Sequence, residues 1–229
     1  MQYNILIDYG LIFLGLIITL IAQGYITSSY NKYKKVISKN KLTGLDVAKK
    51  ILESNNLSHI HVVETEGNLT DHYDPKRKVI RLSTDIYHED SIASISVAAH
   101  ECGHALQDKD NYTFLKIRNN IVPYVNISSR LGYIAIMIGF LFSITDLAVA
   151  GVILLLSILL FQLITLPVEI NASHRALQEL EKLSLIDTKE KQSCKTMLTA
   201  AALTYVASLV TTLLQILRYV LILNSKRRR

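Results

Sequence analysis

The chain has 229 residues, of which half are hydrophobic, and it carries a formal net charge of +6 and only two cysteines. Its apolar residues gather in runs at about 10–28, 131–145, 147–168 and 197–223, and a helix needs roughly 20 such residues to cross a bilayer. This distribution argues against a soluble globular protein, because these runs have no polar face to offer to water. The small number of cysteines argues against a disulfide framework.

The apolar runs and the polar segments between them divide the chain into five predicted parts. A first transmembrane helix covers residues 1–28, and a polar lobe covers residues 29–120. Residues 121–168 form a transmembrane hairpin, residues 169–196 a further helix, and residues 197–229 a fourth hydrophobic helix with a basic tail. The N-terminus lacks a basic n-region and a clear cleavage site, so we expect an uncleaved anchor.

The distribution of positive charge predicts which parts face the cytoplasm. Lys and Arg number 15 in residues 27–130 and five in residues 169–196, whereas residues 1–8 and 143–147 contain none. By the positive-inside rule, the lobe and the segment 169–196 lie on the cytoplasmic side of the cell membrane. The basic tail disagrees, because four full spans would place it outside, so the sequence leaves open whether the fourth segment crosses.

Residue patterns within the lobe predict a helix, two strands and a second helix. Apolar residues recur at helical spacing over 43–53, with Thr43 as the N-cap. Polar and apolar residues alternate over 59–63 and 78–82, which indicates two strands. We therefore predict an α+β, mostly helical multi-pass membrane protein with about four transmembrane helices and a small lobe.

The second predicted helix of the lobe contains His100-Glu101-x-x-His104, the signature of zinc hydrolases. Residues four apart lie one above the other on a helix, so the two imidazoles can converge on one tetrahedral Zn²⁺. Glu101 lies about 100° round the helix, where it can take a proton from a zinc-bound water without being a ligand. Gly103 leaves room for another backbone or a substrate to approach.

A third zinc ligand must lie outside this motif, because catalytic zinc keeps three protein ligands and one open position. Glu169 is the best candidate, since a short hairpin returns the chain to the side that it left. A carboxylate at the end of a membrane helix, just after Pro167, is costly unless it has a partner. Asp110 is the alternative, six residues after His104, although Gln107 stands where that longer motif requires glycine.

The zinc motif and three other segments resemble, in sequence and order, the YugP-like neutral zinc metallopeptidases, a family of bacterial membrane proteins. The resemblance covers nearly the whole chain. It implies a zincin-like catalytic lobe with a gluzincin-type site for one Zn²⁺, in which His100, His104 and Glu169 are the ligands and Glu101 is the base. The four segments are residues 69–75, 97–107, 166–177 and 200–206.

Further residues are expected to orient the ligands and to stabilise the reacting groups. Many gluzincins place an Asp four residues after the ligand Glu to orient a zinc histidine, and here that position is Ser173. Asn171, His174 or an acid of the 72–74 segment is then expected to take over this role. A nearby Tyr73 or His72 is a candidate to stabilise the oxyanion of a tetrahedral intermediate.

These features predict a membrane-embedded zinc metalloendopeptidase that uses a zinc-bound water and Glu101 to hydrolyse membrane-proximal or misfolded proteins. By analogy with thermolysin-like folds, strand 78–82 is expected to hold extended substrate by strand addition. The alternative is a non-catalytic membrane scaffold with a structural zinc, for which Cys102 or His174 would supply a fourth ligand. We expect contacts with membrane lipids and none with nucleic acid.

Overall fold

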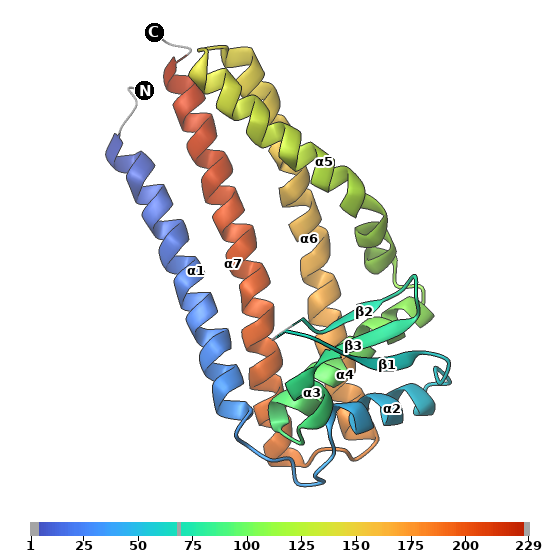
Figure 1. Ribbon diagram of the computed structural model, residues 1–229. Coiled ribbons are helices and arrows are strands. Elements are labelled where there is room, and N and C mark those ends of the chain that lie inside the picture. Colours follow the sequence, from blue (N-terminus) through green and yellow to red (C-terminus); the bar gives the residue numbers. More distant parts are fainter. Residues whose placement is uncertain (1–4, 68–69, 227–229) are drawn as a thin grey trace. The chain divides into compact units, whose positions relative to one another are not determined.

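Four helices of the computed structural model, which describes residues 5–67 and 70–226, are long and apolar enough to cross a membrane. The chain divides into two units, and every one of these helices contributes residues to both. The helical unit comprises Met1–Gln23, Lys116–Leu166 and Thr204–Arg229, and the lobe comprises Gly24–Leu115 and Pro167–Leu203. The four helices are α1 (Ile5–Tyr33), α5 (Thr113–Leu141), α6 (Thr145–Lys182) and α7 (Thr188–Lys226) (Figure 1).

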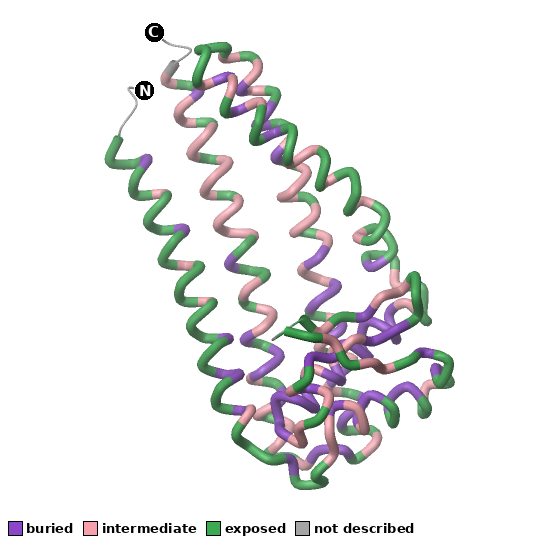
Figure 2. Tube along the Cα trace, in the orientation of Figure 1, coloured by how far each residue is buried: buried purple, intermediate pink, exposed green. Residues whose placement is uncertain are grey.

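The predicted fold class is confirmed, because the described chain is mostly helical and contains one small sheet. Buried residues concentrate in the lobe, whereas long stretches of α1 are exposed (Figure 2). The exposed side chains of the helical unit are largely aliphatic or aromatic, which suits a lipid environment. Residues 227–229, which carry most of the predicted basic tail, lie outside the described residues.

Within the helical unit, α5 and α6 follow one another as a helical hairpin. The turn between them covers residues 142–144, and Ser143 adopts a positive φ of 58°. The two helices approach closely through glycine, because a Cβ added at Gly139 would lie 2.6 Å from the backbone nitrogen of Ala148. Small residues of this kind let helix backbones pack closely in membranes.

The N-terminal part of α1 and the C-terminal part of α7 are joined by an ion pair. Arg218 donates from Nε to Asp8 Oδ1 at 2.6 Å, and the Asp8 side chain is only 8% exposed. The sequence left open whether the fourth apolar segment is re-entrant. The structure describes α7 as one continuous helix of 39 residues, so the segment contains no re-entrant turn.

The lobe is built on a three-stranded sheet with the order β1-β3-β2. Strand β1 (His61–Thr65) runs parallel to β3 (Val79–Ser83), and β2 (His72–Asp74) runs antiparallel to it. The expectation that strand 78–82 holds a substrate at its edge is therefore wrong. Because β3 pairs on both sides, its backbone has no free edge to offer, and the free edges belong to β1 and β2.

Helices α2 (Gly44–Ser54), α3 (Thr84–His88) and α4 (Ile92–Lys109) complete the lobe. The predicted cap of α2 is confirmed, since Thr43 and Asp46 form a reciprocal capping box. Ser91 caps α4 by accepting a hydrogen bond from the Ser94 N–H. Apolar side chains of α2, β3 and α4 are fully buried, and each stabilises the lobe by about 1.5–3 kcal/mol. They include Val47, Ile51, Ile80, Leu82, Ile92 and Ile95.

Candidate metal centre

Helix α4 carries the two histidines and the glutamate of the zinc motif. His100 and His104 lie one turn apart, with ring centroids 4.8 Å apart and ring planes at 84°. Gly103 allows α6 to approach α4, because a Cβ at this position would lie 2.4 Å from the Ala172 carbonyl oxygen. The glycine therefore permits the close packing that brings the Glu169 segment of α6 to the histidines.

Three side chains converge at this contact. Glu169 Oε2 lies 3.2 Å from Nε2 of His100 and 3.5 Å from Nε2 of His104. The donor atoms of the three residues all lie within 4.8 Å of one another. The Glu169 side chain is 5% exposed, so its carboxylate is removed from solvent and faces two imidazoles.

This donor set fits zinc. Two imidazole nitrogens and one carboxylate oxygen are the ligands of thermolysin-type catalytic sites, which leave a fourth position open. Asp110, the alternative third ligand, lies outside the group. Its Oδ2 accepts a hydrogen bond from Arg175 at 2.5 Å, and its side chain is 51% exposed.

Glu101 is buried beside the group. Burial raises the pKa of its carboxyl group to about 7, while the nearby His100 opposes that shift. The backbone of Tyr73 also opposes the shift, so this part of β2 lies near the Glu101 carboxylate. A carboxyl group with a pKa near neutrality can both accept and release a proton at physiological pH.

Ser173, which stands where many gluzincins have an Asp, contacts one of the histidines directly. The Ser173 hydroxyl lies 3.2 Å from Nδ1 of His100, which is the ring nitrogen opposite the one that faces Glu169. His174 is exposed and lines a polar cavity of about 320 Å³ together with Asp110 and Arg175. It therefore lies away from the three converging side chains.

The two oxyanion candidates make other contacts. The Tyr73 hydroxyl donates to Asp108 Oδ2 at 2.7 Å, and Lys78 reaches the same oxygen. Burial and the Asp108 contact raise the pKa of Tyr73 far above its ordinary value, so this hydroxyl stays protonated and engaged. His72 is exposed, and its Nδ1 donates to the Thr70 carbonyl at 2.8 Å.

Sequence reasoning missed Gln107, which contacts the second histidine. Gln107 Oε1 lies 3.0 Å from His104 Nδ1, and the Gln107 side chain is fully buried. Its position three residues after His104 places it on the same helix face, and this spacing was the available signal.

Over the described residues, fold and site together define a helix-rich protein with four helices able to cross a membrane and a group of two histidines and one glutamate able to hold a metal ion. The chain belongs to the family described as "Putative neutral zinc metallopeptidase", whose sequence profile matches residues 9–224. It is 43% identical over 206 residues to the curated "Putative membrane protease YugP" of Bacillus subtilis (strain 168), covering 90% of this chain and 92% of that protein. Solved structures give no significant match. The family confirms the resemblance seen in the motifs, and its cofactor is zinc.

Proposed function

We propose that the protein is a membrane-embedded zinc metalloendopeptidase, in which His100, His104 and Glu169 hold the zinc and Glu101 is the general base. The observation that carries this proposal is the convergence of the three donor groups, within 4.8 Å of one another, on a buried site beside Glu101. A site that only holds a structural metal has no use for a buried carboxylate that lies beside the donor group without belonging to it.

The residues divide the work of peptide hydrolysis between them. When bound, zinc supplies Lewis acidity, which activates water and polarises a carbonyl. Glu101 accepts the proton of the attacking water and returns it to the leaving amine.

Substrate is proposed to bind along the free edge of β2. This strand pairs with β3 on one side only, and its Tyr73 backbone lies near Glu101. An extended peptide that added to this edge would pass close to the base, as in other strand-addition complexes. Glu169 lies on a helix that is long enough to cross a membrane, which favours membrane-proximal or misfolded proteins as substrates.

The alternative, a scaffold with a structural zinc, would need a fourth protein ligand. Cys102 is fully buried, and its thiol donates to the Ala48 carbonyl at 3.7 Å. Burial also raises the pKa of the Cys102 thiol, so the thiolate that binds metals is disfavoured. His174 is exposed at a different cavity. Neither residue is placed to close the site.

The proposed activity is tested with purified, zinc-loaded protein in detergent and a mixture of labelled casein and unfolded peptides. We expect cleavage that stops with a zinc chelator such as 1,10-phenanthroline and returns when zinc is added back. A peptide mixture left intact by fully zinc-loaded, folded protein would count against a peptidase.

We further propose that the lobe faces the cytoplasm, because residues 27–130 and 169–196 hold 15 and five of the 25 basic residues. Lys50 of the lobe and Ser143 of the α5–α6 turn are both exposed and suit cysteine labelling. In intact cells, a membrane-impermeant maleimide is expected to label Ser143→Cys at once and Lys50→Cys only after lysis. The reverse pattern would place the lobe outside.

A further inference from the structure

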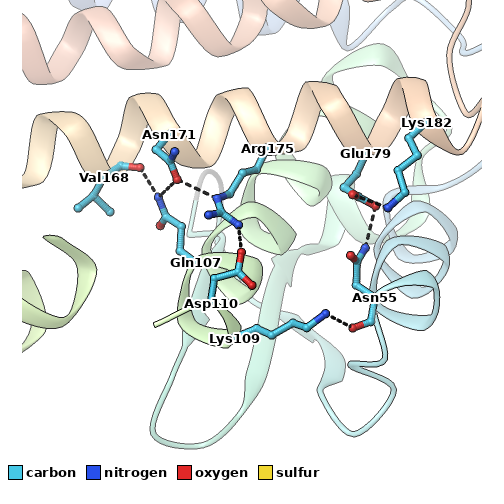
Figure 3. Close-up of polar contacts among 9 residues, drawn as sticks. All are labelled: Asn55, Gln107, Lys109, Asp110, Val168, Asn171, Arg175, Glu179 and Lys182. Carbon is cyan, nitrogen blue, oxygen red and sulfur yellow. Dashed lines mark hydrogen bonds and ion pairs between the residues drawn. The ribbon is translucent and has the colours of Figure 1, made fainter. Parts of the chain in front are cut away.

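We propose that Gln107 is a positioning residue that fixes the tautomer and the ring orientation of His104, and that Asn171 and Arg175 in turn fix Gln107. The inference rests on the proposed role of His104 as a zinc ligand and assigns a role to three residues outside the ligand set. It is carried by a chain of hydrogen bonds in which each donor and acceptor is determined by chemistry, and Figure 3 shows the part of it that runs from Gln107 to Asp110.

The orientation of the Gln107 amide is set by a backbone carbonyl. Gln107 Nε2 lies 2.8 Å from the carbonyl oxygen of Val168, which can only accept a hydrogen bond. The NH₂ group of the amide must therefore face Val168, and its oxygen must face His104. An amide flipped the other way would set two acceptors against each other in a fully buried position.

This orientation determines the tautomer of His104. Gln107 Oε1 has no hydrogen to give, so His104 Nδ1 must carry the proton across the 3.0 Å contact. The lone pair is then left on Nε2, the nitrogen that faces Glu169. An imidazole held in this way presents its metal-binding nitrogen toward the other two donors without first losing or moving a proton.

Asn171 and Arg175 hold Gln107 from the far side, as Figure 3 shows. Asn171 Oδ1 accepts from Gln107 Nε2 at 3.0 Å and from Arg175 Nε at 2.8 Å. Arginine can only donate, so the oxygen of Asn171 must face both partners. Arg175 is itself anchored by its ion pair with Asp110. The hydrogen bonds thus run from the Asp110–Arg175 ion pair to His104, and the donor and acceptor of each are determined.

The two histidines are held unequally. His100 Nδ1 meets a serine hydroxyl at 3.2 Å, and that hydroxyl can rotate. His104 meets an amide whose second end is anchored at two acceptors. Both partners are neutral, whereas many gluzincins use a carboxylate to accept the second ring N–H of a zinc-binding histidine. We therefore expect the Gln107 contact to contribute more to zinc affinity than the Ser173 contact.

The test measures zinc affinity by competition with a chelator, and the visible spectrum of the cobalt-substituted protein, for wild type and Gln107→Met. We expect zinc to bind about 10–100-fold more weakly and the cobalt bands to shift, because partners of this kind typically contribute that much to metal affinity. Gln178→Met is the matched control, since Gln178 is exposed on the same helix as Glu169. Gln107→Met affinity within twofold of wild type would overturn the proposal.

A second pair of variants separates positioning from packing and serves if Gln107→Met does not fold. Asn171→Asp keeps an oxygen that accepts from both Gln107 and Arg175, so its zinc affinity is expected to match wild type. Asn171→Leu removes that oxygen and is expected to bind zinc several-fold more weakly. Equal zinc affinity of the two variants would contradict the proposed chain of hydrogen bonds.

These measurements do not depend on peptidase activity. If His104→Ala keeps wild-type zinc affinity, the ligand assignment fails and the proposed function with it. If His104→Ala loses zinc whereas Gln107→Met and Asn171→Leu keep it, only the positioning inference fails.

Discussion

Replacing Glu101 by glutamine is expected to abolish peptide hydrolysis while zinc remains bound. The substitution keeps the size of the side chain, but an amide cannot accept and return a proton as a carboxylate does. General acid–base groups contribute about 10²–10⁴-fold to rate, so kcat/KM should fall by about that factor. The measurement is hydrolysis of a labelled peptide, with zinc content determined on the same samples.

Glu179→Gln is the control for this variant. Glu179 is also a buried carboxylate, but it accepts hydrogen bonds from Asn55 and Lys182 and lies outside the metal group (Figure 3). Its substitution is expected to leave kcat/KM within a few-fold of wild type. If Glu101→Gln were to keep more than a tenth of the wild-type activity, Glu101 would not be the base.

Glu169→Gln is expected to lose zinc itself, and hydrolysis with it. The carboxylate is the one anionic donor of the three, and its oxygen lies 3.2 Å and 3.5 Å from the two imidazole nitrogens. Loss of a residue that only hydrogen-bonds a ligand weakens zinc binding by about 10–100-fold. Loss of a ligand itself should therefore weaken zinc binding by more than about 100-fold. Zinc affinity by chelator competition and metal content after dialysis measure this effect.

Asp110→Asn belongs in the same experiment, because Asp110 is the alternative ligand that the sequence leaves open. Its carboxylate pairs with Arg175, which supports Gln107 through Asn171. Its substitution is therefore expected to lower zinc affinity only slightly. Full zinc retention in Glu169→Gln together with zinc loss in Asp110→Asn would reverse the assignment.

The sequence predicted those parts of the lobe that depend on contacts close along the chain. The zinc helix and the Thr43 cap follow from local rules, since i, i+4 spacing and capping need only a few neighbouring residues. Glu169 lies 65 residues after His104, and it was found by a different argument, that a short hairpin returns the chain to its starting side. The structure brings Glu169 to both histidines.

The order of strands could not be predicted in the same way. Residues 78–82 have the composition of a strand. Nothing local indicates that this strand, β3, lies between β1 and β2 in the sheet, because β2 precedes it in the sequence. Pairing depends on contacts far apart along the chain, so the central strand was mistaken for an edge. Gln107 was missed for a related reason. Its role depends on the Val168 carbonyl, 61 residues away, which fixes its amide.

The central claim is that one zinc ion is held by two histidines and one glutamate at a site that keeps a position open. Zinc K-edge X-ray absorption on the purified wild-type protein tests this most directly, because it distinguishes imidazole, light oxygen and sulfur donors. We expect two imidazole ligands, further oxygen donors and no sulfur. A sulfur donor, or a third imidazole, would indicate a closed structural site and contradict the account.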